Sequence, residues 1–565
     1  MKKTVKKQVI SLLALAISTG TVLAACSKGS DTSSTSSPSS AATSTPTTFN
    51  GKFDPPITLT AVKWVEGDNK FKQGESIENN VLDKTIAADT GIQMKYLWTA
   101  STGDAYKEKL RLSFTANEEM PEIVMVDDTT LMKQMVDSGK YREVGDLFDK
   151  YAGPTWKEAV AAHPESWNLS TINGKKYGFP MLNTVNAGDD VLWIREDWLK
   201  KLNLKAPTTI DEMDAVLEAF TKQDPDGNGK ADTFGLSAAL KDSTIGRWMG
   251  DYGFVFGAYG VHGGWSKGSD GKLMETIITP AAKQALTKLS GWVSKGYIPQ
   301  DAGVFDEMKA GELFNAGKAG MIVGNHWLSV WPFPDLKKNV PTAEFKPYPL
   351  PVGPDGKTSY GTNNATNGRV IMVSKVSKHP EAVPVYLNWF YENYLNPKKG
   401  SKYEYGLAEN YDWAVVDGKP TNDKAKVPNY LDVVRYSIPK DFNLPDSWIK
   451  IMTKFTSGGK PETPLEVKFM GGLDDPSIAA AKIILDAKAK GYPQTDLAAG
   501  VPATSTRQSK GSMLDKMKTE TWINIIYGKQ PVDSYDKFIS DYKAAGYEQY
   551  AKEVNEWYQA NIANK

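Results

Sequence analysis

The chain has 565 residues and balances 67 basic against 67 acidic side chains, for a formal net charge of zero. This balance leaves no basic stripe to neutralise phosphates, so nucleic acid is not expected as a partner. A chain of this length is expected to form two or more lobes, and its single cysteine, Cys26, excludes an internal disulfide.

The N-terminus has the pattern of an export signal. A basic stretch precedes a mostly apolar run from Val9 to Leu23, and the run ends in Leu23-Ala-Ala-Cys26, a lipobox pattern. Cleavage before Cys26 would leave its thiol to carry a diacylglycerol, and the alternative is an ordinary secretory signal with an incidental cysteine. We therefore expect a signal peptide over residues 1–25 and a lipid anchor at Cys26.

Residues 26–52 are expected to be a disordered tether. Fifteen of the 24 residues from 27 to 50 are Ser or Thr, a composition that cannot bury enough apolar surface to order itself. No later segment has the roughly 18 consecutive apolar residues of a membrane-spanning helix. The lipid is thus the expected attachment to the membrane.

The mature chain opens with alternating strands and helices. Strands are predicted over 57–65, 92–98 and 122–126, and helices over 79–89 and 106–115. This order predicts a parallel α/β sheet, in which ligands bind beyond the carboxyl ends of the strands. Trp64 and Asp127 follow two of these ends and are predicted ligand residues, although Asp127 and Asp128 are equally typical of helix caps.

A well-marked helix is predicted between Thr209 and the stop at Asp224-Pro225. Thr209 is a typical N-cap, and Glu212 three residues later completes a capping box. The apolar residues that follow recur at spacings of three and four and predict one buried face; they are Ile210, Met213, Leu217 and Phe220.

A loop rich in oxygen side chains follows this helix. Positions 1, 3, 5 and 9 of an EF-hand type loop are occupied by oxygen side chains and position 6 is Gly; the residues are Asp224, Asp226, Asn228, Gly229 and Asp232. The carbonyl of Lys230 would add a ligand, whereas position 12 is Gly235 in place of a bidentate Glu. The pattern predicts a structural calcium site, with a plain Asp-Gly/Asn-Gly turn as the alternative.

Aromatic residues are frequent between 237 and 275, where many glycines predict loops and short strands. Aromatic rings stack on the apolar faces of sugars, so tryptophans on such loops and at strand ends are predicted ligand residues, with core packing as the alternative for each. The predicted stacking residues are Trp64, Trp248, Trp265, Trp327, Trp331 and Trp413. Arg247 is predicted to bind hydroxyl groups or an acidic sugar. Three C-terminal helices are predicted over 477–488, 510–527 and 534–557.

Two enzyme-like patterns are rejected. Ser266 lies in a Gly-x-Ser-x-Gly sequence, but a turn follows where a nucleophile elbow needs a helix. The four histidines are far apart, and none of their spacings fits a zinc site. The sequence therefore predicts no enzyme.

Several short motifs resemble extracellular solute-binding lipoproteins of bacterial ABC sugar importers, family 1 type, and above all the large branch that includes alginate-binding proteins. The motifs occur in the order of that family over most of the chain after residue 55. They are Met120-Pro-Glu-Ile123, Tyr177-Gly-Phe-Pro180, Arg195-Glu-Asp-Trp-Leu199, the loop from Asp224, Gly317-Lys-Ala-Gly-Met321, His379-Pro-Glu-Ala382 and Ile525-Ile-Tyr-Gly528.

The resemblance implies a two-lobed type II binding-protein fold of class α/β. Each lobe would be a mainly parallel sheet flanked by helices, with the ligand cleft between them. Lobe 1 would comprise 53–180 and 370–450, and lobe 2 would comprise 181–369 and 451–565.

The resemblance also implies a function. A monomer would capture an oligosaccharide and deliver it to ABC permease subunits with a separate ATPase, at the outer face of a membrane of Gram-positive type. Calcium would be held by Asp224, Asp226, Asn228, Lys230 and Asp232, with Thr233 where that branch has an acidic residue. The alternatives are a surface-anchored polysaccharide hydrolase or lyase, or a glycan- or peptide-binding adhesion module.

Overall fold

The computed structural model of the protein describes residues 51–563 except 68, 184–189, 242–244, 357, 360–365, 441 and 471. The predicted signal peptide, Cys26 and nearly all of the tether lie outside the described residues. None of the helices in the described ranges combines the length and apolarity needed to cross a bilayer.

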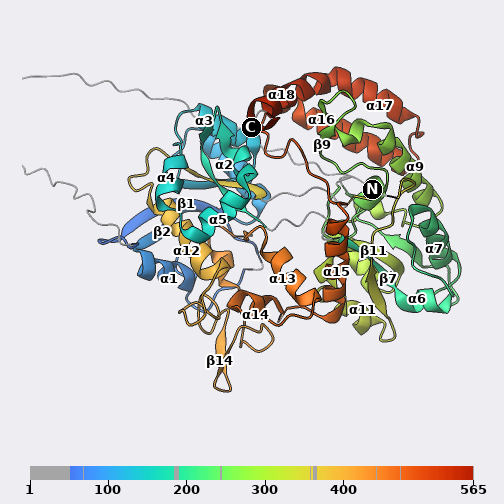
Figure 1. Cartoon of the computed structure of the whole chain (residues 1–565), viewed down its shortest axis with the longest axis horizontal. Coiled ribbons are helices and arrows are strands. Elements are labelled where there is room, and N and C mark those ends of the chain that lie inside the picture. The colour runs from blue at the N-terminus through green and yellow to red at the C-terminus, as the bar shows by residue number, and fades with distance from the viewer. Residues whose placement is uncertain are drawn as a thin grey trace, which may run out of the picture. The chain divides into compact units, whose positions relative to one another are not determined.

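The first sheet has five strands in the order β2-β1-β3-β13-β6 (Figure 1). They are β1 (Ile57–Trp64), β2 (Ile92–Ala100), β3 (Ile123–Val126), β6 (Gly178–Leu182) and β13 (Thr366–Val373). β1 runs parallel to β2 and β3, as predicted, and β13 runs antiparallel to β3 and β6. Helices α1 (Val81–Thr90) and α2 (Gly103–Thr115) connect the parallel strands.

The second sheet has four strands in the order β12-β7-β11-β8. They are β7 (Asp190–Arg195), β8 (Phe234–Ser237), β11 (Ala319–Asn325) and β12 (Phe345–Tyr348). Only β11 and β8 are parallel, whereas β7 runs antiparallel to both β11 and β12. The prediction of a mainly parallel sheet is wrong here, because β7 pairs with β11 and β12 and not with β8, its neighbour along the chain.

The predicted helix forms as α7 (Ile210–Lys222). Thr209 Oγ1 accepts from Glu212 N at 3.1 Å and the Glu212 carboxylate accepts from Thr209 N, which confirms the capping box. The predicted apolar face is buried. The ring of Phe220 covers Gly320 of β11 so closely that a Cβ atom at that position would overlap it.

The aromatic segment from 237 to 275 differs from its prediction. It contains helix α8 (Gly253–Ala258), and Tyr252, Phe254 and Phe256 are at most 2% exposed. Phe256 stacks on Trp522 with ring centroids 4.5 Å apart. The segment is buried because C-terminal helices cover it, and such a distant partner leaves no local mark in the sequence.

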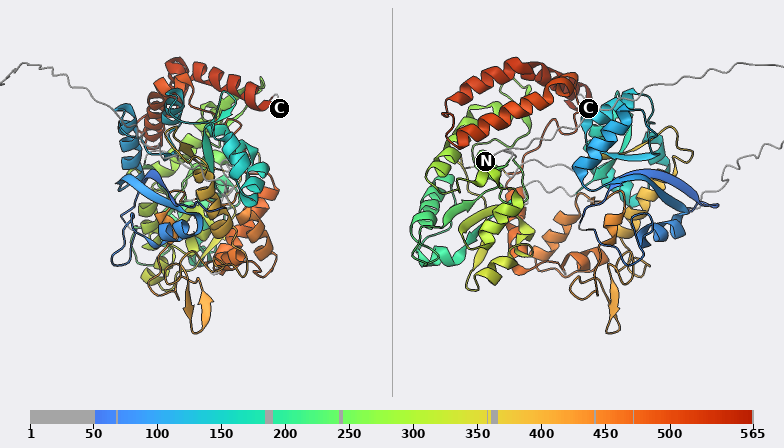
Figure 2. Two further views of the ribbon diagram at one scale, coloured as in Figure 1. Left: turned by 90° about the vertical axis from the view of Figure 1, so that its left-hand side faces the viewer. Right: turned by 180° about the vertical axis from the view of Figure 1, so that it is seen from behind.

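The C-terminal helices lie side by side in Figures 1 and 2. They are α16 (Ser505–Ile526), α17 (Ser534–Tyr542) and α18 (Glu548–Tyr558), preceded by α15 (Asp475–Ala489). The prediction of one helix over 534–557 is wrong, since Gly546 between α17 and α18 has φ of 143°, outside the helical region.

The remaining α-helices are α3 (Thr129–Asp137), α4 (Gly145–Tyr151), α5 (Pro154–Ala162), α6 (Glu196–Lys201), α9 (Pro280–Ser294), α10 (Glu307–Asn315), α11 (Pro334–Asn339), α12 (Ala382–Phe390), α13 (Ser447–Thr456) and α14 (Pro464–Met470). The remaining strands form hairpins: β4 (Thr171–Ile172) with β5 (Lys175–Lys176), β9 (Trp265–Lys267) with β10 (Leu273–Glu275), and β14 (Ala414–Val416) with β15 (Lys419–Thr421).

Buried apolar residues form separate cores around the two sheets. One core draws on residues 53–182 and 370–442, and the others draw on residues 191–350 and 448–558. The predicted lobe boundaries stay a prediction.

Replacing Thr209 by Ala should lower the free energy of unfolding by about 1 kcal/mol, because the first turn of α7 loses its capping acceptor. Urea denaturation of the purified protein measures the change. Thr287→Ala, at an exposed position inside α9, is the matched control and should be nearly neutral. Equal losses in both variants would contradict the capping role.

Candidate functional site

Three of the predicted tryptophans form one cluster. Trp248 stacks on Trp327 and Trp331 with centroid separations of 5.5 and 5.7 Å, and each pair of rings lies within 18° of parallel. Trp331 is 51% exposed, whereas Trp248 and Trp327 are half-buried. The cluster thus presents an aromatic face to solvent.

The end of β11 positions this tryptophan cluster. Trp327 lies in the short 3-10 helix η5 (His326–Ser329) that directly follows β11, and Asn325 N donates to Trp248 O at 3.1 Å. A Cβ atom on Gly324 would lie 2.7 Å from Trp248 O, so this close approach requires glycine.

His326, at the base of the cluster, is buried against Trp448 of α13. Trp448 Nε1 donates to His326 Nε2 at 3.0 Å, and the two ring centroids are 4.9 Å apart. Burial lowers the pKa of His326 to about 3, so this ring is neutral at physiological pH.

A polar pocket of about 690 Å³ lies beside Trp64, at the carboxyl end of β1. It is lined by Glu66, Tyr394, Asp432, Val434, Arg435, Lys440, Phe442 and Asn443. Trp64 itself is 6% exposed, with Lys440 Nζ 4.1 Å from the centre of its ring and the Tyr106 ring 5.2 Å away, so this predicted stacking ring is buried in the structure, as Trp265 is.

Glu66 is the centre of the hydrogen bonds in this pocket. Its carboxylate accepts from Trp64 Nε1 at 3.0 Å, Arg435 Nη2 at 2.8 Å and Lys440 Nζ at 2.8 Å. Partial burial alone would raise the pKa of Glu66, but the bonds from Lys440, Arg435 and Trp64 outweigh it and lower the pKa to about 2. The carboxylate of Glu66 thus joins an indole, a guanidinium and an ammonium at the carboxyl end of β1.

The other predicted ligand residues have different surroundings. Asp127 pairs with Lys107 at 3.2 Å, whereas Asp128 caps α3 through Thr130 N and Leu131 N, so the capping alternative is correct for Asp128. Arg247 is paired with Glu307 at 3.0 Å and its side chain is 9% exposed.

Trp265 is 5% exposed and packs on Tyr547 and Tyr550, so the prediction of an exposed ring at this position is wrong. The chain covers it with α18 and the turn before that helix. Trp413 is half-buried and its ring lies 6.0 Å from that of Tyr405.

The loop from Asp224 to Asp232 is closed by its own hydrogen bonds. Asp224 accepts from the backbone N–H groups of Asn228 and Gly229, each at 3.0 Å, and the Asn228 amide donates to Asp226 and Asp232. Asp224 itself has φ of 47°, in the left-handed region that Asp tolerates.

A cation of the protein already lies in this loop. Lys318 Nζ is 3.1 Å from Asp226 Oδ2 and 2.8 Å from Asp232 Oδ2. Within the described part of the chain, no group of three or more His, Cys, Asp or Glu side chains is arranged to bind a metal ion. The oxygen donors fit calcium in type and spacing, but in this conformation the ammonium of Lys318 takes the place between two of the carboxylates.

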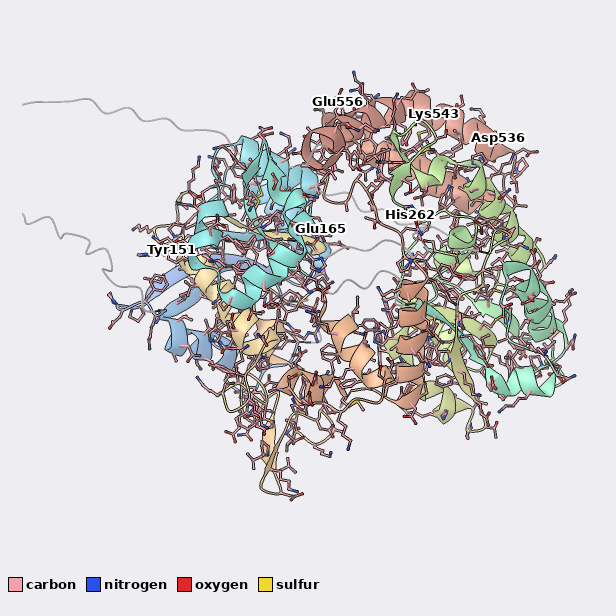
Figure 3. The ribbon with its side chains drawn as sticks, in the orientation of Figure 1. Tyr151, Glu165, His262, Asp536, Lys543 and Glu556 are labelled. Atoms are coloured by element: carbon pink, nitrogen blue, oxygen red, sulfur yellow. The ribbon has the colours of Figure 1, made fainter. Side chains whose placement is uncertain are left out.

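Ser266 and His262 form a hydrogen bond that resembles a nucleophile and its base. His262 (Figure 3) is 2.7 Å from Ser266 Oγ through Nε2, while its Nδ1 accepts from Gly264 N at 3.3 Å. With Gly264 N donating to Nδ1, a neutral imidazole carries its proton on Nε2 and donates to Ser266 Oγ. A turn and strand β10 follow Ser266, as predicted, where a nucleophile elbow would have a helix.

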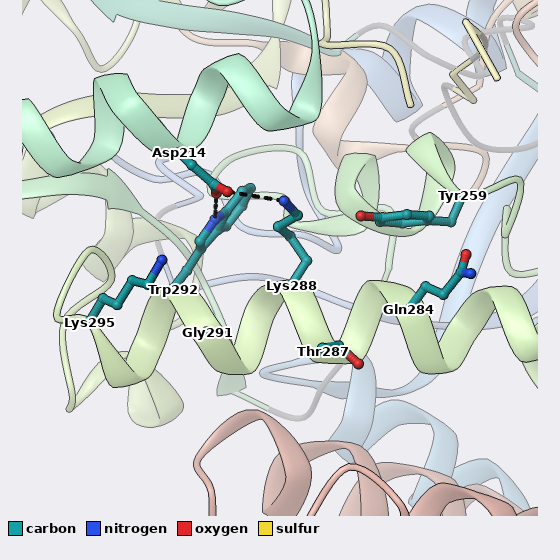
Figure 4. A pocket seen from close by; sticks show the side chains of 8 residues that line it. All are labelled: Asp214, Tyr259, Gln284, Thr287, Lys288, Gly291, Trp292 and Lys295. Carbon is teal, nitrogen blue, oxygen red and sulfur yellow. Dashed lines mark hydrogen bonds and ion pairs between the residues drawn. The ribbon is translucent and has the colours of Figure 1, made fainter. Parts of the chain in front are cut away.

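A second pocket, of about 450 Å³, lies along α9 (Figure 4). Asp214 accepts from Trp292 Nε1 at 2.5 Å and from Lys288 Nζ at 3.1 Å. Trp292 is only 1% exposed and offers no ring face to a ligand. The tryptophan cluster, because Trp331 is exposed, and the pocket beside Trp64, because of its larger volume and its charged groups, are the stronger candidates.

Sequence reasoning missed Arg435, Lys440 and Asn443, which the pocket beside Trp64 contains. Apart from one turn of 3-10 helix, the described residues between 430 and 446 form no helix or strand, so periodicity gives no signal there. Only the fold identifies them, by bringing Arg435 and Lys440 to Glu66 and Asn443 to the same pocket.

The free energy of unfolding should depend on pH through His326. The unfolded chain takes up a proton near the usual pKa of 6.5 whereas the folded protein resists until about 3, so stability falls as pH drops from 6.5 towards 3. The slope approaches about 1.4 kcal/mol per pH unit.

Denaturation between pH 7 and pH 4 measures this slope. His326→Gln keeps an acceptor for Trp448 but binds no proton, so the number of protons taken up on unfolding should fall by about one and the slope should be correspondingly smaller. Identical slopes in both proteins would contradict the assignment.

Comparison with known proteins agrees with this structure. The sequence profile described as bacterial extracellular solute-binding protein matches residues 71–394. The polygalacturonan/rhamnogalacturonan-binding protein YtcQ of Bacillus subtilis is 29% identical over 414 residues, which cover 70% of this chain and 72% of YtcQ.

Two solved structures share the fold. Alginate-binding protein AlgQ2 without calcium ion has a TM-score of 0.64 at 17% identity, over 90% of this chain and 99% of the other. The EF-hand mutant of the Streptococcus pneumoniae substrate-binding protein FusA, in complex with fructo-nystose, has a TM-score of 0.62 at 18% identity, over 90% and 100%. The chain belongs to the family of bacterial extracellular solute-binding proteins and has their two-lobed α/β fold.

Proposed function

We propose that the protein captures an oligosaccharide outside the cell and delivers it to the permease subunits of an ABC importer whose ATPase is a separate chain. The stacked cluster of Trp248, Trp327 and Trp331, with half of the Trp331 side chain exposed, is the observation that supports this most directly. Aromatic faces bind the apolar faces of sugar rings. Family membership supports the role of solute capture.

The ligand class that we propose first is an oligosaccharide containing uronic acid. The relative YtcQ is named for polygalacturonan and rhamnogalacturonan. Beside Trp64, Arg435 and Lys440 place charged N–H donors in the pocket, where they already pair with Glu66, and a uronate carboxylate would have to share these donors.

The ligand would bind between two lobes, each contributing one of the two candidate surfaces. Lobe 1 would comprise residues 53–180 and 370–450 and hold the pocket beside Trp64. Lobe 2 would comprise residues 181–369 and 451–565 and hold the tryptophan cluster. Closure of two lobes about the connecting segments would then enclose the sugar.

The anchor is part of the same proposal. Processing before Cys26 and transfer of a diacylglycerol to its thiol would hold the binding lobes at the outer surface of the membrane through the tether. Mass spectrometry of the N-terminal peptide from membranes of the native organism tests it, and an unmodified Cys26 or a chain that retains residues 1–25 would contradict it.

Titration with oligosaccharides tests the proposed function. Intrinsic tryptophan fluorescence of a chain beginning at residue 51 should shift saturably with oligogalacturonates, and chromatography should show the sugar unchanged. Bond cleavage would favour a hydrolase or lyase, and affinity for intact cell wall without affinity for short glycans would favour an adhesion module.

Replacing Trp331 by Ala should weaken oligosaccharide binding by at least about tenfold, or about 1.4 kcal/mol, since the most exposed ring of the cluster is lost. Calorimetric titration measures the affinity. Trp557→Ala, a half-buried tryptophan of α18, is the matched control and should bind as the wild type does. Equal affinities for wild type and Trp331→Ala would exclude the cluster as the sugar platform.

We also propose that the loop from Asp224 binds calcium, with oxygens from Asp224, Asp226, Asn228, Lys230 and Asp232. The ion would take over the two carboxylates that Lys318 now neutralises. The spacing of the donors supports this site, and the structurally similar protein FusA has been solved as an EF-hand mutant.

Calcium added to chelator-treated protein should therefore raise the thermal unfolding midpoint, by the equivalent of about 2.7 kcal/mol at a concentration 100 times the dissociation constant. Asp224→Ala should remove this response, and Asp270→Ala, in an exposed turn, should keep it. An unchanged midpoint of the wild type in millimolar calcium would contradict the site and leave Lys318 as the cation that neutralises the loop.

A further inference from the structure

Lys63 is a buried cation that the proposed function does not use. It lies on β1 next to Trp64 and is 2% exposed. An ammonium group costs several kcal/mol to remove from water unless its three N–H donors and its charge are compensated. The buried Lys63 ammonium therefore needs three hydrogen-bond acceptors from the protein.

The three acceptors are consecutive backbone carbonyls. Lys63 Nζ donates to the oxygens of Arg435 at 3.1 Å, Tyr436 at 2.7 Å and Ser437 at 2.7 Å. These residues belong to or follow the 3-10 helix η7 (Val433–Tyr436). One side chain of β1 thereby fixes a segment more than 370 positions away in sequence.

Asp83 offsets part of the cost of burying the charge of Lys63. Burial lowers the pKa of Lys63, and the negative charge of Asp83 in α1 opposes this. Asp83 in turn accepts from Asn80 Nδ2 at 2.9 Å and from Tyr96 Oη at 3.5 Å. The ammonium of Lys63 on β1 therefore binds η7 directly, and the charge of Asp83 acts on it from α1.

The segment from Asp432 to Asn443, which contains the three carbonyls bound by Lys63, forms most of the pocket beside Trp64. Asp432, Val434, Arg435, Lys440, Phe442 and Asn443 all line the pocket and lie within twelve positions of one another. Apart from η7, the described residues of this segment form no helix or strand that would hold them in place. From this segment, Arg435 and Lys440 both donate to the Glu66 carboxylate.

We propose that Lys63 is the positioning residue of the pocket beside Trp64: its ammonium binds three successive carbonyls and so holds Arg435 and Lys440 on Glu66, ready for the ligand. The role of this pocket in ligand binding rests on the proposed function. The fixation of the segment 433–443 by Lys63 does not, and is testable in the ligand-free protein.

The first measurement is hydrogen exchange of the ligand-free protein. In Lys63→Met, which keeps the length of the side chain and removes the donors, amides of residues 433–443 should lose protection about tenfold or more, while β11 and α7 keep theirs. Lys95→Met, at an exposed position of the neighbouring strand β2, is the control and should change neither region. Unchanged protection of 433–443 in Lys63→Met would overturn the proposal.

The second measurement is ligand affinity with chemical rescue. Lys63→Ala should bind the oligosaccharide at least about tenfold more weakly, and n-propylammonium, which restores the missing atoms and the charge, should recover affinity. Propanol, which has the shape without the charge, should not. Recovery with both additives would show cavity filling alone and overturn the role of the ammonium.

The two measurements separate the failure of the inference from that of the proposed function. If the wild type binds no glycan, the proposed function fails, and hydrogen exchange alone decides whether Lys63 fixes the segment. If the wild type binds, and Lys63→Met loosens the segment without loss of affinity, the pocket is not the ligand site and Lys63 is not its positioning residue. Should either Lys63 variant fail to fold, wild-type protection factors between pH 6 and pH 9 give the answer. Burial lowers the pKa of Lys63 to about 7, so its deprotonation across this range removes a donor and should loosen only residues 433–443.

Discussion

The second sheet depends on how closely other parts of the chain approach strand β11. Gly320 leaves room for the ring of Phe220 from α7, and Gly324 leaves room for the backbone of Trp248. A side chain at either position would push its neighbour away from the strand. The first contact seats the helix that leads to the loop at Asp224, and the second aligns Trp248 with the tryptophans beyond the end of the strand. One strand thus controls both the candidate calcium loop and an aromatic surface.

The first sheet uses charge where the second uses aromatic packing. The Glu66 carboxylate accepts hydrogen bonds from an indole, a guanidinium and an ammonium, and the Lys63 ammonium donates to three carbonyls. Both groups have most of their hydrogen-bonding capacity satisfied by the protein. Fully paired polar groups of this kind hold a fixed geometry, which a binding site requires if its ligand is not to supply the energy of ordering it.

The two candidate surfaces differ in their chemistry. Stacked tryptophans offer apolar contact, and the pocket beside Trp64 offers charged donors and acceptors. The hydrogen bond between His262 and Ser266 belongs to a strand that a turn follows, and a nucleophile elbow would need a helix there. The family to which the chain belongs agrees with capture of a solute.

Local sequence patterns determined the elements whose information is short-range. The capping box and apolar spacing of α7 follow from neighbours three and four residues apart, and the alternation of β1, α1, β2, α2 and β3 follows from periodicity in the same way. Tertiary structure alone decided the direction of β7, the burial of Trp265 under α18 and the engagement of Arg247 by Glu307. It also decided the pocket beside Trp64, in which Glu66 meets residues about 370 positions away. Such contacts depend on which surfaces pack together, and no spacing within the chain encodes that distance.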